Sequence, residues 1–164
     1  MSIAISGGEL LNIAIGIERQ GIAFYDTMAR SSGNTITCEV FQYLADMERR
    51  HLQLFQDMLA EAADWQAPES YSDEQIGYIK GLVESAVFSD EMASGEIINH
   101  TESDIGALEL AISAEKDSIL FYYEMGDIIP RGNRHTVEQI INEEKLHLRQ
   151  LTELKNKLAA SKEE

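Results

Sequence analysis

An internal repeat is the sequence feature that most constrains the fold of this chain. The segment GIERQGIAFYDTMA (16–29) matches SAEKDSILFYYEMG (113–126), and MERRHLQLFQDML (47–59) matches EEKLHLRQLTELK (143–155). The two segments are displaced by nearly the same distance along the chain, 97 residues for the first and 96 for the second. The repeat therefore predicts two structurally similar halves, each built as a helical hairpin.

Each half is predicted to contain two helices, because its apolar residues recur at intervals of three and four. We expect hairpins over 6–63 and 103–160. The connection over 64–102 is too long for neighbouring antiparallel helices and is typical of a crossover along a four-helix bundle. A Ser72–Gln75 capping box, followed by apolar residues at Ile76, Ile79, Leu82, Val83 and Val87, predicts a short helix within it. The expected fold is therefore all-α, with 1–164 forming a single domain.

Composition excludes several classes of protein. A net charge of −16 argues against a nucleic-acid partner, since binding phosphates requires a basic patch. The single cysteine, Cys38, excludes an internal disulfide and a metal site built from several thiolates of this chain. No apolar run approaches the ~20 residues that span a bilayer, so we expect no membrane partner. The N-terminus lacks the charged region of a signal peptide, and the expected location is cytoplasmic.

Two Glu-x-x-His pairs stand inside apolar helical stripes. Glu48 and His51 lie among apolar residues of the second predicted helix, and Glu144 and His147 lie among those of the fourth. A buried ionised carboxylate is costly unless a cation or a hydrogen-bonding group accompanies it. Side chains at i and i+3 present adjacent donors, and this spacing on an inward helix face is that of di-iron and di-manganese carboxylate bundles.

One further glutamate stands at equivalent positions in the first and third predicted helices. Each glutamate shares its helix face with residues that correspond between the two helices. The corresponding pairs are Leu11 and Leu108, Ala14 and Ala111, Gly21 and Ser118, Tyr25 and Tyr122, and Met28 and Met125. Together with the two Glu-x-x-His pairs they predict a site of four carboxylates and two imidazoles. Oxygen-rich donors with imidazole suit iron or manganese, and two dications would neutralise the four carboxylates.

These motifs resemble the ferritin-like superfamily, and most closely its rubrerythrin-type branch. The pattern E-x5-F-Y, followed about 30 residues later by Glu-x-x-His, occurs twice and covers nearly the whole chain except the crossover. The resemblance implies a ferritin-like bundle in which Glu48 and Glu144 bridge two metal ions. It also implies that Glu18 and Glu115 are terminal ligands and that His51 and His147 bind one ion each. Tyr25 and Tyr122 resemble tyrosines that hydrogen-bond to ligand carboxylates.

The match to rubrerythrins departs from the family pattern at two points. Rubrerythrins carry a second glutamate one turn from the third-helix ligand, but Ile112 and Ser118 stand one turn either side of Glu115. The ligand set is consequently closer to that of bacterioferritin. No C-terminal rubredoxin-like domain is present in the sequence, so electrons are expected from another protein.

Several residues keep a second interpretation. The Glu-x-x-His pairs could form buried ion pairs or the exposed edge of an amphipathic helix, and Tyr25 and Tyr122 could serve core packing alone. Glu143 competes with Glu144 as a ligand, but the repeat aligns Glu144 with Glu48 and leaves Glu143 solvated. The remaining histidines are expected to be exposed, namely His100 and His135.

The resulting hypothesis is a non-haem di-iron oxidoreductase that reduces hydrogen peroxide. Its expected cofactors are two iron ions, with manganese or zinc as alternative metals, and its electrons come from an external donor protein. A second hypothesis is a ferroxidase or iron-storage module of a larger assembly, which uses dioxygen at the same centre. A third is a helical metal-binding or interaction protein without catalysis. The acidic surface and an open bundle edge favour a homodimer.

Overall fold

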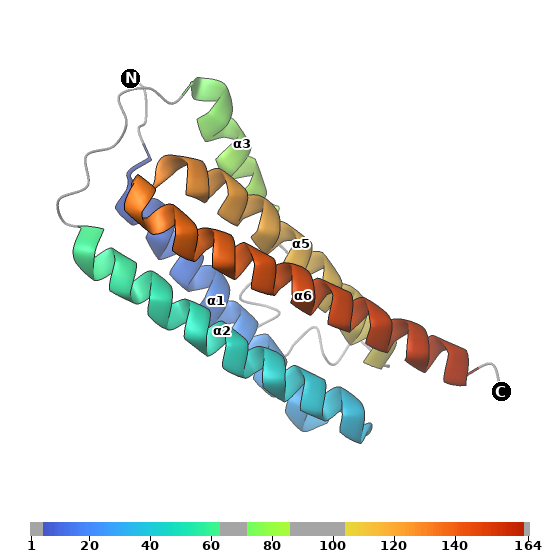
Figure 1. Cartoon of the computed structure of the whole chain (residues 1–164). Coiled ribbons are helices and arrows are strands. Elements are labelled where there is room, and N and C mark those ends of the chain that lie inside the picture. The colour runs from blue at the N-terminus through green and yellow to red at the C-terminus, as the bar shows by residue number, and fades with distance from the viewer. Residues whose placement is uncertain (1–4, 63–71, 86–103, 163–164) are drawn as a thin grey trace.

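The computed structural model describes residues 5–62, 72–85 and 104–162, and all regular structure within these ranges is helical. The helices are α1 (Gly7–Ser31), α2 (Thr35–Glu61), α3 (Asp73–Glu84), α5 (Asp104–Ile128) and α6 (Arg131–Ser161). The four long helices form a bundle in which α1 pairs with α2 and α5 pairs with α6 (Figure 1). The predicted all-α fold is confirmed.

Local sequence signals set where these helices begin. The Ser6–Glu9 capping box is formed, with the Ser6 hydroxyl 3.1 Å from the Glu9 amide and the Glu9 carboxylate 2.7 Å from the Ser6 amide. Asn34 caps α2 by accepting a hydrogen bond from the Thr37 amide at 3.0 Å. The last helix, α6, begins at Arg131, directly after Pro130. Pro130 favours this start, because its fixed φ of −55° leads directly into a helix.

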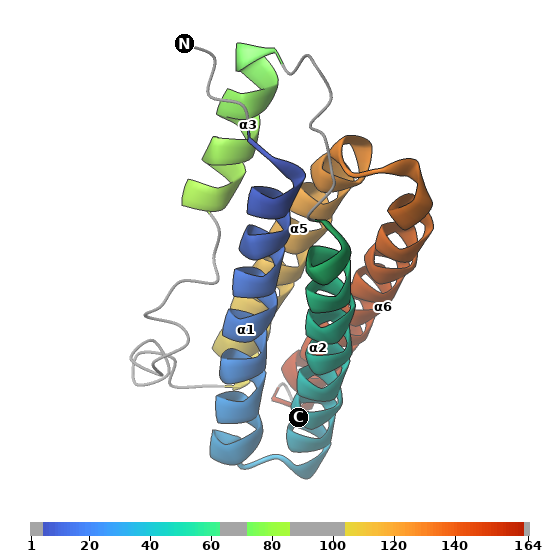
Figure 2. The same cartoon turned by 90° about the vertical axis from the view of Figure 1, so that its left-hand side faces the viewer.

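The crossover contains the short helix that the sequence predicts, and α3 lies beside one end of the bundle next to α1 and α5 (Figures 1 and 2). Its capping box is formed between Ser72 and Gln75. Ile76 and Ile79 are buried, and Ile79 joins the apolar cluster at that end. Val83 is 37% exposed, while Val87 lies outside the described residues.

The apolar core consists of two clusters. One contains Leu10, Phe55 and Tyr122, and the other contains Phe24, Tyr25 and Phe41, each with further buried residues of all four long helices. Both clusters adjoin buried polar side chains, because Tyr25 of one cluster and Tyr122 of the other each donate a hydrogen bond to a buried glutamate. No helix in the described ranges is both long and apolar enough to cross a bilayer.

Candidate metal centre

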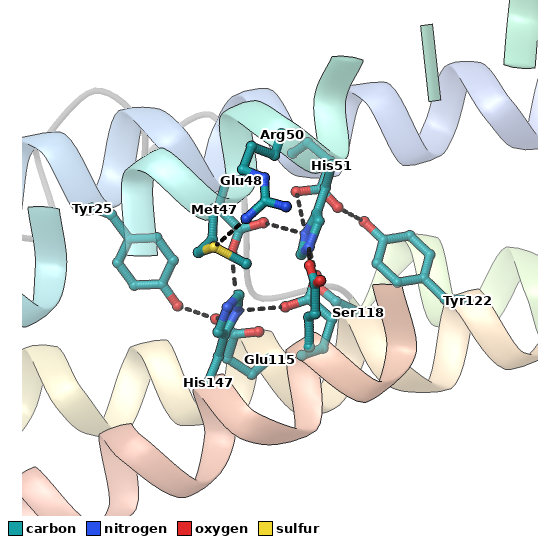
Figure 3. A network of polar contacts seen from close by, with 12 residues as sticks. Tyr25, Met47, Glu48, Arg50, His51, Glu115, Ser118, Tyr122 and His147 are labelled. Atoms are coloured by element: carbon teal, nitrogen blue, oxygen red, sulfur yellow. Dashed lines mark hydrogen bonds and ion pairs between the residues drawn. The ribbon is translucent and has the colours of Figure 1, made fainter. Parts of the chain in front are cut away.

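The structure brings together all six side chains that the sequence singled out. Each of the four long helices contributes, and every one of these residues is at most 3% exposed. The six are Glu18 from α1, Glu48 and His51 from α2, Glu115 from α5, and Glu144 and His147 from α6. Figure 3 shows the polar network that joins them. The alternative of an exposed helix edge is therefore wrong for both Glu-x-x-His pairs.

The cluster divides into two sets of four possible ligands. In each set, one donor atom per residue lies within 4.8 Å of the others. The first set is Glu18, Glu48, His51 and Glu144, and the second is Glu48, Glu115, Glu144 and His147. Two carboxylates, those of Glu48 and Glu144, belong to both sets. The arrangement is therefore suited to two neighbouring cations that share two carboxylates.

Both imidazoles present the same nitrogen to the carboxylates. The Nδ1 atom of His51 lies 3.3 Å from Oε2 of Glu48 and 3.1 Å from Oε1 of Glu144. The Nδ1 atom of His147 lies 2.9 Å from Oε2 of Glu144 and 3.7 Å from Oε1 of Glu48. The two rings stack with their centroids 5.8 Å apart. Nδ1 is thus the atom of each histidine placed to bind a cation, and Nε2 is directed away.

Two buried tyrosines hold the carboxylates that belong to only one set. Tyr25 on α1 donates to Oε1 of Glu115 on α5, and Tyr122 on α5 donates to Oε1 of Glu18 on α1 (Figure 3). Both tyrosines are fully buried. They do more than fill the core, because each hydroxyl fixes one terminal carboxylate.

Aromatic rings hold these two tyrosines in place. The ring of Phe41 stacks on Tyr25 with centroids 5.9 Å apart, and the ring of Phe55 packs on Tyr122 at 5.1 Å. The rings also cover the ends of the polar cluster with apolar surface. Contacts of this kind restrict the tyrosine rotamers and keep water away from the carboxylates.

Glu143 requires a correction. The prediction that it is solvated holds only in part, because its side chain is 35% exposed but its Oε2 atom lies 2.8 Å from Nε2 of His51. A carboxylate on the outer nitrogen of a metal-binding histidine orients the ring. The sequence signal was present in the acidic pair Glu143-Glu144, but the contact depends on how α6 lies against α2.

The other sequence predictions near the site have different outcomes. Ser118 is buried and its hydroxyl donates to the Ala114 carbonyl at 3.0 Å, so it adds no acidic ligand beside Glu115. His135 is exposed, as predicted, and His100 lies outside the described residues. Cys38 is half-buried near the start of α2, with its sulfur 3.2 Å from the Ser32 carbonyl oxygen.

Without a cation, the site must hold protons. Burial, followed by the charge of neighbouring carboxylates, raises the pKa of Glu18, Glu48 and Glu115 well above the usual range. Burial also acts to raise the pKa of Glu144, but hydrogen bonds from the two histidines outweigh it and lower that pKa. For His51, burial acts to lower the pKa, while Glu144, Glu18 and Glu143 together raise it to about 9.

A helical bundle that buries four carboxylates and two imidazoles in this arrangement has the ligand set of the ferritin-like carboxylate bundles that hold two metal ions. The family model for rubrerythrin matches residues 9–155, and the chain belongs to the rubrerythrin family. The predicted resemblance is thereby confirmed.

The fold is also similar to the crystal structure of a protein from Thermotoga maritima that is assigned to the ferritin-like diiron-carboxylate class. The two share 31% sequence identity and a TM-score of 0.69, with 93% of this chain and 95% of the other covered. No curated protein shows a significant match to the chain.

Proposed function

We propose that the protein is a di-iron oxidoreductase that reduces hydrogen peroxide with electrons from an external donor protein. The observation that carries the proposal is the pair of buried ligand sets sharing Glu48 and Glu144. Membership of the rubrerythrin family and similarity to a diiron-carboxylate protein support iron as the metal.

The chemistry of the donors fits two divalent cations. Four ionised carboxylates and two neutral imidazoles carry a formal charge that two dications would neutralise, which removes the cost of burying isolated charges. In the proposed assignment Glu48 and Glu144 would be shared by the two ions, and Glu18 and Glu115 would each hold one. His51 and His147 each bind one ion through Nδ1. Hard oxygen donors with imidazole suit iron and manganese, and zinc also accepts such donors.

Residues around the ligands prepare the site before any ion arrives. The hydroxyls of Tyr25 and Tyr122 keep the terminal carboxylates in place across the bundle. Phe41 and Phe55, both fully buried, exclude water behind these tyrosines. Preorganised ligands reduce the reorganisation that binding and redox chemistry would otherwise require.

Two ferrous ions held by these residues would supply the two electrons that convert one hydrogen peroxide and two protons into two waters. These 164 residues contain a single cysteine, too few for a rubredoxin-type centre, which needs four thiolates, so the proposal assigns the restoring electrons to a donor outside them. Cys38 itself lies near the start of α2, hydrogen-bonded to Ser32 and apart from the six proposed ligands.

The proposal is tested with protein purified without added metal. Elemental analysis should give two iron ions per chain. The anaerobic di-ferrous protein should then be oxidised rapidly by one equivalent of peroxide, while dioxygen reacts more slowly. Absence of rapid oxidation by peroxide in protein that holds two ferrous ions would exclude peroxide reduction. Glu138→Gln, on the exposed face of α6, is the control and should react normally.

One observation favours a second candidate function, a ferroxidase that uses dioxygen. The positions one turn either side of Glu115 hold Ile112 and Ser118, and Ser118 is bonded to its own helix. A ligand set of six without an added glutamate resembles that of bacterioferritin. Faster oxidation by dioxygen than by peroxide would support this candidate. Light scattering separates an iron-storing cage from the homodimer that we expect.

A further inference from the structure

The two halves of the metal centre differ at one position next to the shared carboxylates. The repeat that aligns Glu144 with Glu48 also aligns Glu143 with Met47. Each of these two residues directly precedes a shared glutamate. An acidic side chain therefore stands on one side of the centre where a thioether stands on the other.

This difference changes what the outer nitrogen of each histidine contacts. The Nε2 atom of His51 lies 2.8 Å from the Glu143 carboxylate. The Nε2 atom of His147 is buried, and no residue in the described ranges offers it a hydrogen bond. Its Nδ1 atom nevertheless faces the shared carboxylates just as that of His51 does. The two imidazoles are equivalent on their inner side and different on their outer side.

Met47, which corresponds to Glu143 in the repeat, does not supply His147 with a hydrogen-bond acceptor. Met47 is 7% exposed, and its sulfur contacts the Arg50 guanidinium at 3.4 Å (Figure 3). The ring of Tyr43 packs edge-on against His147, with centroids 6.3 Å apart. A thioether is a weak acceptor and an aromatic ring is weaker still, so neither fixes the His147 tautomer as a carboxylate does.

A carboxylate that accepts from the outer N–H of a histidine keeps the inner nitrogen free of its proton and makes it a stronger ligand. We propose that the two metal positions are inequivalent, and that Glu143 makes the position formed by Glu18 and His51 bind its ion first and more tightly. The position formed by Glu115 and His147 binds second. This proposal rests on the proposed di-metal function and assigns Glu143 as a positioning residue.

The test is a titration of metal-free protein with Co²⁺, which is stable to oxidation and gives an absorption spectrum when bound. Two close cations repel each other, so even a symmetrical centre would fill in two steps. Variants are therefore needed to assign the steps. Glu18→Ala should abolish the tight step and retain the weak one, whereas Glu115→Ala should retain the tight step.

Substitution of the two outer residues tests the cause. Glu143→Met should weaken the first step by about 10- to 100-fold and leave the second step nearly unchanged. Met47→Glu should strengthen the second step by a similar factor. Glu143 is partly exposed and lines a recess of about 500 Å³ between α2 and α6, so its replacement opens no core cavity. Glu143→Gln is the conservative variant and should weaken the first step less than Glu143→Met does. Glu138→Gln should change neither step.

Equal weakening of both steps in Glu143→Met, or equal affinities in Glu18→Ala and Glu115→Ala, would overturn the proposal. Protein that binds two Co²⁺ with the expected asymmetry but does not reduce peroxide when loaded with iron would overturn the proposed function alone. Protein that binds no Co²⁺ would overturn both.

Discussion

Tyr122 on α5 donates a buried hydrogen bond to Glu18 on α1, a residue 104 positions earlier in the chain. Tyr25 makes the reciprocal bond to Glu115. Each tyrosine lies seven positions after the glutamate of its own helix, a rise of about 10.5 Å, and bonds instead to the glutamate of the other helix. Because α1 and α5 run in opposite directions (Figures 1 and 2) and helical side chains lean toward the N-terminus of their own helix, each glutamate leans toward the tyrosine of the other helix.

Removing the Tyr122 hydroxyl should weaken the centre without emptying the core. Tyr122→Phe leaves a Glu18 oxygen buried without its donor, and we expect a loss of about 1–3 kcal/mol in unfolding free energy of the metal-free protein. Metal affinity should fall by about 10- to 100-fold. Denaturant unfolding and metal titration provide the two measurements. Tyr78→Phe, at a tyrosine that is 47% exposed on α3, is the control, and an equal effect there would contradict the prediction.

Replacing a shared carboxylate should weaken metal binding at both positions, whereas replacing a terminal carboxylate should weaken binding mainly at the position to which it belongs. Glu144→Gln keeps the shape of the side chain but removes its charge, so we expect both ions to bind at least about 100-fold more weakly. Glu115→Gln should chiefly affect one ion. Equilibrium dialysis against Mn²⁺ followed by elemental analysis gives the number bound. Retention of one tightly held ion in Glu144→Gln would show that this residue is not shared.

Metal-free protein should lose stability as the pH rises from 6.5 to 9. The pKa of His51 is raised to about 9 in the folded state, so its contribution is complete below its ordinary value of 6.5 and disappears as the pH passes through 9. The raised pKa values of Glu18, Glu48 and Glu115 act in the same direction. One pKa unit corresponds to about 1.4 kcal/mol, which limits the His51 contribution to ~3 kcal/mol.

Urea unfolding at several pH values in the presence of a chelator measures this dependence. Metal-loaded protein is the comparison, because bound cations keep the carboxylates ionised and should flatten or reverse the trend. Stability of the metal-free protein that increases between pH 6.5 and 9 would contradict the assignment of protons to the cluster.

Phe55 should support both the core and the centre. It is fully buried against Tyr122, and Phe55→Ala should cost about 3–5 kcal/mol in unfolding free energy because it leaves a cavity. Loss of this contact should also release the Tyr122 ring and weaken metal binding. Leu54→Ala, at the neighbouring residue that is 39% exposed, should cost less than about 1 kcal/mol. Thermal unfolding with and without metal compares the two variants.

The long helices and the six proposed ligands could be predicted because their signals are periodic. A residue three or four positions from an apolar neighbour must share its face, and the repeat places corresponding residues at the same level of the bundle. The start of α6 was less predictable, since Pro130 can either end one element or begin the next.

The sequence by itself determined that four carboxylates and two imidazoles point into one helical core, because the 3.6-residue period and the 97-residue and 96-residue offsets leave few other arrangements. Only the tertiary structure decided that Tyr25 serves Glu115 rather than Glu18, and that Glu143 contacts His51. These contacts cross between helices. Their geometry depends on the direction and separation of neighbouring helices, which the period of a single helix does not specify.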